Sequence, residues 1–189
     1  LSAFYFDIRK DTLYCDSKSS AKRKACINLL GLILDILLKW YAPILSFTTE
    51  EIFQILNQGQ NSSMHLQKFP SIPKTWKNEK LFKKWEKFKI IRKVVNAAME
   101  VKRANKDIGS SLEADVQVYL KEDYLKIAKD FDLSENFITS KAEAKQMINE
   151  KNLFKLNEIE DIKVLVKKAK GEKCPRCWKI FPGLCKRCG

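Results

Sequence analysis

The stretch CPRCWKIFPGLCKRCG, residues 174–189, decides how the C-terminal end of this chain folds. It holds four of the six cysteines as two CxxC pairs with seven residues between them. Two thiolates spaced in this way can hold one metal ion from a tight turn, and a second pair completes the tetrahedral shell that Zn²⁺ prefers. The spacing predicts one zinc ion bound by Cys174, Cys177, Cys185 and Cys188.

Two other uses of these cysteines are less favoured. Disulfides belong to oxidising compartments, and a redox site needs one CxxC in a suitable fold rather than two matched pairs. With four protein ligands the metal has no open position for a substrate or an activated water. We therefore expect the zinc to be structural, and a tail this short to depend on it for folding.

The chain is strongly basic, and its positive charge lies in two blocks. It has 189 residues, 45% of them hydrophobic, which is enough for a core, and 36 Lys and Arg against 23 Asp and Glu. Residues 73–106 carry 12 basic and 3 acidic groups and residues 162–189 carry 9 and 1, whereas residues 107–161 carry 7 and 13. This charge favours a polyanionic partner, with nucleic acid the first candidate.

The basic tail combines cations with an aromatic ring. That combination neutralises phosphates and stacks on an exposed base of single-stranded or looped RNA. The candidate contacts are Arg176, Trp178, Lys179, Lys186 and Arg187. Trp178 has an alternative role as a hydrophobic cap over the metal. The lysines at 80, 83, 84 and 87 form either a solvated helix face or an anion-binding one.

The first half of the chain reads as helical. Apolar residues at helical spacing predict a buried helix that ends before Pro43, and Asp35, Lys39 and Pro43 argue against a membrane span over residues 29–45. A shorter helix follows, capped by Thr48 or Thr49, and a long helix with one apolar face covers residues 79–106.

A second region follows the break at residues 107–111, where the period of the apolar residues changes from helical to alternating. Residues 114–120 and 162–169 are predicted strands. Between them we expect a short helix at 123–131, a possible strand at 137–139 and a helix at 141–148. Cys15 and Cys26 are expected to be buried free thiols, and His65 to have no catalytic partner.

Four stretches, taken in order, resemble the C-terminal portion of bacterial isoleucyl-tRNA synthetases. They are FYFDIRKDTLYCD, KWYAPILSFTTEEIF, KRANKDIGSSLEADVQVY and KCPRCWK with the terminal CxxC, and together they span nearly the whole chain. The resemblance implies a mainly α fold: a helical-bundle anticodon-binding domain of class I synthetases, a small α+β region and a four-cysteine zinc finger. The implied boundaries are residues 1–106, 107–170 and 171–189.

The resemblance also implies a function, that of a cytoplasmic ligase which joins isoleucine to its tRNA using ATP. This region would bind the anticodon stem and loop of that tRNA. The HIGH and KMSKS signatures of ATP binding do not occur in the sequence, so we expect the fragment alone to be inactive. The expected partners are the isoleucine tRNA and the rest of the synthetase chain, with no membrane, and the expected state is a monomer.

Individual residues carry over where the motifs match. The zinc ligands map onto the four cysteines, Arg176 and Trp178 become candidates for RNA contact, and Arg103 either braces the domain junction or touches tRNA. Seven residues between the pairs is shorter than the family pattern. Two alternatives stay open from the residues alone: a DNA-binding module like that of some DNA glycosylases, and a structural zinc docking domain.

Overall fold

The chain folds as two compact units. The sheet unit consists of Leu1–Asp16 and Asn78–Gly189, and the helical unit consists of Ser17–Lys77. The computed structural model describes residues 2–59, 61–148 and 152–188. The helical unit is thus inserted into the sequence of the sheet unit.

The helical unit contains two α-helices, α2 (Ala21–Tyr41) and α3 (Ser46–Leu56), and short 3-10 turns at Met64–Leu66 and Lys74–Trp76. The hydroxyl of Ser20 caps α2 by accepting a hydrogen bond from the Arg23 backbone N–H at 3.3 Å. As predicted, α2 ends before Pro43. The predicted cap of α3 is wrong, because α3 begins at Ser46 and Thr49 instead donates its hydroxyl to the Leu45 carbonyl at 3.0 Å.

Much of the apolar surface of α2 is exposed, which corrects the prediction of a buried helix. Leu29, Leu32 and Trp40 are 39%, 46% and 52% exposed. The buried cluster of this unit is small and consists of Leu38, Ala42, Phe53 and Met64. Within its own unit α2 packs mainly against α3 and the turn at Met64–Leu66. None of the helices in the described ranges combines the length and apolarity that a membrane crossing requires.

The sheet unit is built around one mixed sheet of four strands, in the order β2-β1-β4-β3. β1 runs parallel to β2 and antiparallel to β4, and β3 is antiparallel to β4. Its strands are β1 (Ala114–Leu120), β2 (Lys141–Gln146), β3 (Phe154–Leu156) and β4 (Ile159–Lys168). Its helices are α1 (Asp7–Cys15), α4 (Glu79–Ala104), α5 (Glu122–Ala128) and α6 (Leu133–Asn136). A π-helical turn at Ser2–Phe6 precedes α1, and a 3-10 turn at Ser111–Glu113 precedes β1.

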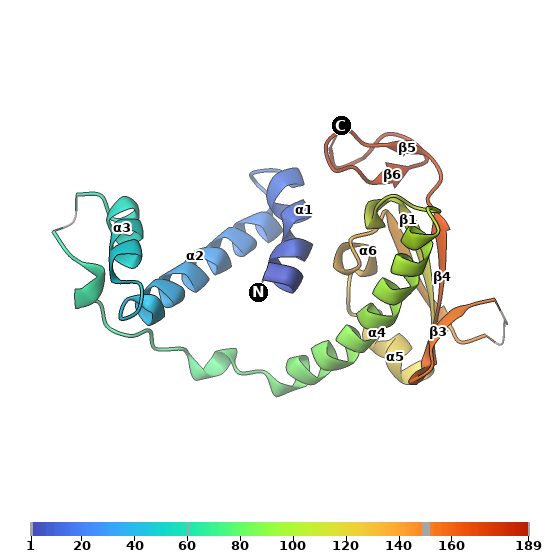
Figure 1. Cartoon of the computed structure of the whole chain (residues 1–189), viewed down its shortest axis with the longest axis horizontal. Coiled ribbons are helices and arrows are strands. Elements are labelled where there is room, and N and C mark those ends of the chain that lie inside the picture. The colour runs from blue at the N-terminus through green and yellow to red at the C-terminus, as the bar shows by residue number, and fades with distance from the viewer. Residues whose placement is uncertain (1, 60, 149–151, 189) are drawn as a thin grey trace. The chain divides into compact units, whose positions relative to one another are not determined.

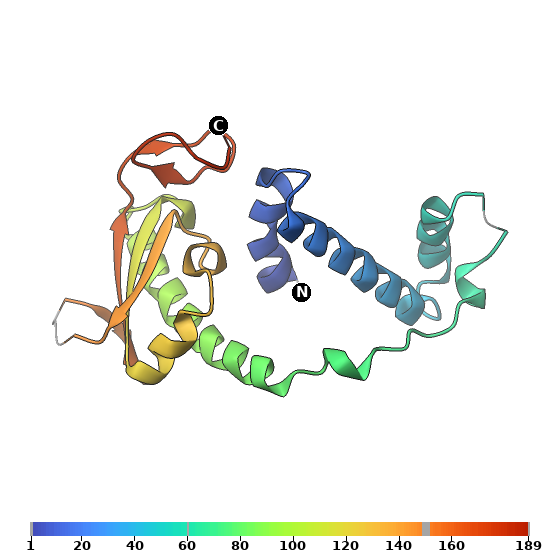
Figure 2. The same cartoon turned by 180° about the vertical axis from the view of Figure 1, so that it is seen from behind.

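Helix α4 covers one face of this sheet (Figure 1), and the core lies between them. The alternating residues of β1 and β4 point into the core, and Val116 and Val118 are fully buried. Phe88 on α4 is also fully buried and stacks on Phe131, with ring centroids 4.3 Å apart. Seen from behind, the strands lie in front of α4 (Figure 2), and this second face carries half-buried residues such as Gln117 and Lys163. The predicted long helix and both predicted strands are confirmed.

Two predicted elements between these strands are wrong. Residues 141–148 were expected to be helical, but KAEAKQ forms β2, because Ala142 and Ala144 pair with Val116 and Val118 of β1 and pack against the core. Tertiary pairing here overrides a local preference for helix. Residues 137–139 are not a strand, since they follow α6 and Ile138 has a φ of 58°, a left-handed conformation that ends helices.

Candidate metal centre and nucleic-acid interface

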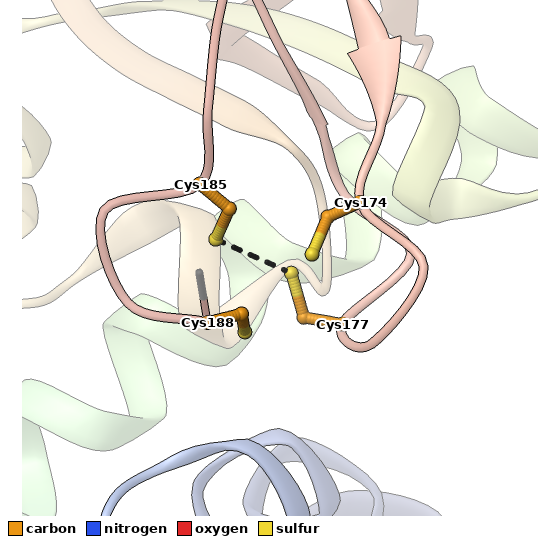
Figure 3. Close-up of side chains that lie close together, drawn as sticks. All are labelled: Cys174, Cys177, Cys185 and Cys188. Carbon is orange, nitrogen blue, oxygen red and sulfur yellow. Dashed lines mark hydrogen bonds between the residues drawn. The ribbon is translucent and has the colours of Figure 1, made fainter.

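Four cysteine sulfurs converge at the C-terminal end of the sheet unit. The Sγ atoms of Cys174, Cys177, Cys185 and Cys188 all lie within 4.8 Å of one another. Figure 3 shows the four side chains pointing toward a common centre, with the sulfurs of Cys177 and Cys185 3.8 Å apart. In a tetrahedron with metal–sulfur bonds of about 2.3 Å, neighbouring sulfurs are about 3.8 Å apart. The cluster therefore fits one tetrahedral metal ion.

A two-stranded ribbon and two tight turns hold these sulfurs. Strand β5 (Glu172–Lys173) pairs with β6 (Ile180–Phe181) in antiparallel orientation. In the first CxxC turn the Trp178 N–H donates to the Cys174 carbonyl at 2.9 Å, and in the second the Cys188 N–H donates to the Cys185 carbonyl at 3.1 Å. Hydrogen bonding within each turn thus fixes the spacing of its two sulfurs.

Gly171 makes the ribbon possible. Its φ is +128°, and a Cβ at this position would lie 1.9 Å from the Phe181 carbonyl oxygen. Only glycine fits so close an approach of two backbones at a positive φ.

The surroundings of Cys174, Cys177 and Cys188 shift the pKa values of their thiols in different directions. Hydrogen bonds from the backbone N–H groups of Cys177 and Arg176 lower the pKa of Cys174 to about 6. Burial raises the pKa of Cys177 to about 12 and also raises the pKa of Cys188. The thiolate of Cys174 is therefore the easiest to form, while Cys177 and Cys188 need a cation to displace their protons.

The burial of Cys15 and Cys26 agrees with the prediction for them. None of the six cysteines forms a disulfide, so none joins the two CxxC pairs. Cys15 and Cys26 are buried thiols, and burial raises the pKa of Cys15. His65 is exposed in the 3-10 turn Met64–Leu66.

Three of the predicted RNA contacts lie on the surface of the metal-binding tail. Arg176 and Lys186 are exposed, and Trp178 is 60% exposed with a left-handed φ of 63°. The Lys173 ammonium group lies 5.7 Å from the centroid of the Trp178 ring. An indole this accessible has surface available for stacking, and its contact with RNA stays a prediction.

The other three predicted RNA contacts form ion pairs within the chain. Arg187 forms two hydrogen bonds to Asp11 of α1, at 2.6 and 2.7 Å. Lys179 is only 8% exposed, and its Nζ lies 3.7 Å from the same carboxylate. Arg103 pairs with Glu100 on its own helix α4. Whether these cations also touch RNA stays a prediction.

Sequence reasoning missed the acidic side of this arrangement, which is on α1. Burial alone would raise the pKa of Asp11, but the hydrogen bond from Arg187 and the charges of Lys179 and Arg187 outweigh it, so the pKa lies below its usual value. The same hydrogen bond, together with the charge of Asp11, raises the pKa of Arg187. Asp11 and Arg187 are 176 residues apart, and no local pattern links them.

Known proteins resemble this chain over nearly its whole length. Residues 1–120 match the family described as the anticodon-binding domain of tRNA ligase. An isoleucine–tRNA ligase of Pelagibacter ubique is 48% identical over 187 residues, which cover 99% of this chain and 19% of that protein. An isoleucine–tRNA ligase of Bradyrhizobium diazoefficiens is 46% identical over 181 residues, 95% of this chain and 18% of that protein.

The chain thus spans about a fifth of the length of these curated relatives. The family match covers more than half of the chain, including α1, the helical unit, α4 and β1. The chain belongs to the anticodon-binding domain family of tRNA ligases.

Proposed function

We propose that this chain is the tRNA-binding C-terminal region of an isoleucine–tRNA ligase, and that it binds the anticodon stem and loop of the isoleucine tRNA. The single observation that carries the proposal is the 48% identity to such a ligase over 99% of the chain. The match of residues 1–120 to an anticodon-binding domain makes a glycosylase-like DNA module or a purely structural zinc domain the weaker alternatives.

The metal in this proposal is one structural Zn²⁺. Three of its four ligands, Cys174, Cys177 and Cys185, are buried. Zinc bound by four thiolates has no free position, so the ion supplies folding energy to the tail rather than chemistry to a substrate. The chain's own contribution is to hold four sulfurs at tetrahedral spacing and to present basic turns beside them.

The RNA-facing surface in this proposal is made by the exposed part of the tail. Trp178 offers a ring to an unpaired base, while Arg176 and Lys186 offer charge to phosphates. Both arginine and lysine lie within one or two residues of a metal ligand, so the folded turns fix where their charges stand.

The chemistry of aminoacylation belongs to other parts of the ligase in this proposal. The chain has no HIGH or KMSKS sequence, so it neither adenylates isoleucine nor hydrolyses ATP alone. As part of a class I ligase it acts in the cytoplasm as a monomer, with the remaining ligase chain and the isoleucine tRNA as its partners.

Binding of the whole chain to RNA tests the proposal. A filter-binding assay at moderate salt compares an isoleucine tRNA transcript, the same transcript with an altered anticodon, and a folded hairpin of equal length. We expect the first to bind best, because base contacts add to the salt-dependent attraction that any RNA of this length receives. Equal affinity for all three would leave only charge attraction and would refute anticodon recognition.

A further inference from the structure

Each CxxC turn sends an arginine to the same helix. Arg176 and Arg187 each stand directly before the second cysteine of their pair. Arg187 holds both carboxylate oxygens of Asp11, at 2.6 and 2.7 Å, and reaches Asp16 at 3.5 Å. Arg176 donates to the Tyr14 carbonyl at 3.4 Å. Both turns of the metal-binding tail therefore attach to the last two turns of α1.

The contact at Asp11 is shielded and specific. The side chains of Asp11 and Lys179 are only 19% and 10% exposed, unlike those of most surface ion pairs. A bidentate arginine–carboxylate pair fixes direction as well as distance. Lys179 adds a second positive charge 3.7 Å from the same carboxylate. Asp11 thus offsets both cations, which would otherwise repel each other, and Asp16 lies near Arg187 as a second acidic group.

Helix α1 is itself fixed to the rest of the sheet unit. Arg9 and the hydroxyl of Thr12 both donate to Glu135 of α6, at 2.7 and 3.2 Å. Ile8 is buried, at 4% exposure. A contact with α1 therefore fixes the tail relative to the whole sheet unit, and not merely to a loose helix.

The contact at Asp11 adds to a few other restraints on the tail. The tail follows β4 through residues 169–171, its Ile180 N–H donates to the Ser140 hydroxyl at 2.6 Å, and its buried cysteines pack with Cys15 of α1. A module on so short a connection pivots unless a second attachment stops it, and RNA that binds a pivoting module must also order it.

We propose that Asp11 is a positioning residue that clamps the metal-binding tail onto α1, so that Trp178, Arg176 and Lys186 face the tRNA together. In this arrangement Arg187 and Lys179 serve the clamp and do not contact phosphates. The inference rests on the proposed function, since it assigns the orientation of the same RNA-binding surface.

The decisive variant is Asp11→Asn in the full chain. The two roles considered for Arg187 predict opposite changes in the tRNA affinity of this variant. Asparagine keeps the shape but removes the charge that holds Arg187 and Lys179. If those cations contacted phosphates, the loss of a nearby acid would strengthen tRNA binding. Because they serve the clamp, we expect tRNA affinity to fall on the order of tenfold although the net charge becomes more positive.

Asp7→Asn is the matched control. It lies on the same helix, makes the same change of charge, and contacts Lys10 at 3.1 Å on the exposed surface. Its tRNA affinity should equal or slightly exceed that of the unaltered chain. Asp11→Glu, which keeps the carboxylate, should restore most of the affinity lost in Asp11→Asn.

Two further measurements separate positioning from loss of the metal and from failure of the proposed function. Zinc content should stay at one per chain in Asp11→Asn, and amide hydrogen exchange over residues 171–188 should become faster, while exchange in α4 stays unchanged. Stronger or equal tRNA binding by Asp11→Asn, loss of its zinc, or unchanged exchange in the tail would each overturn the inference. If the unaltered chain shows no preference for the isoleucine tRNA, the proposed function fails, and hydrogen exchange alone still decides whether Asp11 clamps the tail.

Discussion

Replacing Gly171 by alanine should weaken metal binding although Gly171 is no ligand. The new Cβ would lie 1.9 Å from the Phe181 carbonyl oxygen, so β5 and β6 must separate. The ribbon places Cys174 next to Lys179, whose carbonyl accepts the Cys174 N–H at 2.9 Å. Separation of the strands therefore moves one sulfur away from the other three.

The size of the effect follows from two costs. A residue with a Cβ held at a positive φ costs about 1–3 kcal/mol. Each ribbon hydrogen bond that is lost costs about 0.5–1.5 kcal/mol. Because metal binding and folding of the tail are one equilibrium, a total of about 2–4 kcal/mol appears in the metal affinity. At about 1.4 kcal/mol per factor of ten, the affinity should fall about 30- to 700-fold.

Competition with a chromophoric chelator measures this affinity, and Co²⁺ absorption reports whether the four-thiolate geometry survives. Gly183→Ala is the matched control in the same tail, since a Cβ there meets nothing within 4 Å and its φ is not positive. An affinity of Gly171→Ala equal to that of Gly183→Ala would refute the view that the ribbon presets the sulfur positions.

Three further outcomes are expected. Trp178→Ala should keep the metal and weaken tRNA binding by about 1–3 kcal/mol, as measured by filter binding with zinc content in parallel; full affinity would show that the ring stacks on no base. A strong chelator should speed amide exchange in residues 171–188 but leave the core around Phe88 protected, whereas simultaneous loss of both would show that the core also needs the metal. Metal affinity should fall as the pH is lowered through neutrality, because Cys177, with its pKa raised to about 12, releases a proton on binding and acid opposes that release; the fall should steepen below about pH 6, where Cys174 also holds a proton, and titration calorimetry in buffers of different ionisation enthalpy counts the protons.

The long helix and the two central strands, β1 and β4, could be predicted because local pattern and burial agree there. Residues at helical spacing on α4, such as Phe88 and Ile91, are also the ones that the sheet covers. On β1, each apolar residue of the alternation faces the core. In such segments the spacing of the apolar residues is enough to predict which face is buried.

Predictions failed where a distant partner decides the conformation. β2 is a strand because it pairs with β1, and the residues it pairs with are 26 positions earlier, as in Val116↔Ala142. The exposed face of α2 is the opposite case. Its apolar residues are spaced as on a buried helix face, but the small buried cluster of the helical unit does not cover them.

Part of the candidate site could likewise be predicted from local sequence, and part could not. Cysteine spacing predicted the sulfur cluster, because a tetrahedral ion imposes its geometry on nearby residues. The acid that accepts from Arg187 could not be predicted, because Asp11 reaches it only through the tertiary packing of α1.

The helical unit is inserted into the sequence of the sheet unit, and this affects how the sheet unit folds during synthesis. Helix α1 leaves the ribosome before its partners Glu135 and Arg187, which are 126 and 176 residues later in the sequence. The helical unit, which contains none of these partners, is complete well before they are made. Contacts of such long range form slowly and only after the intervening chain exists. A nascent chain should therefore carry α1 undocked at least until Glu135 of α6 has emerged, and a chaperone that binds short exposed helices would find its target during that interval.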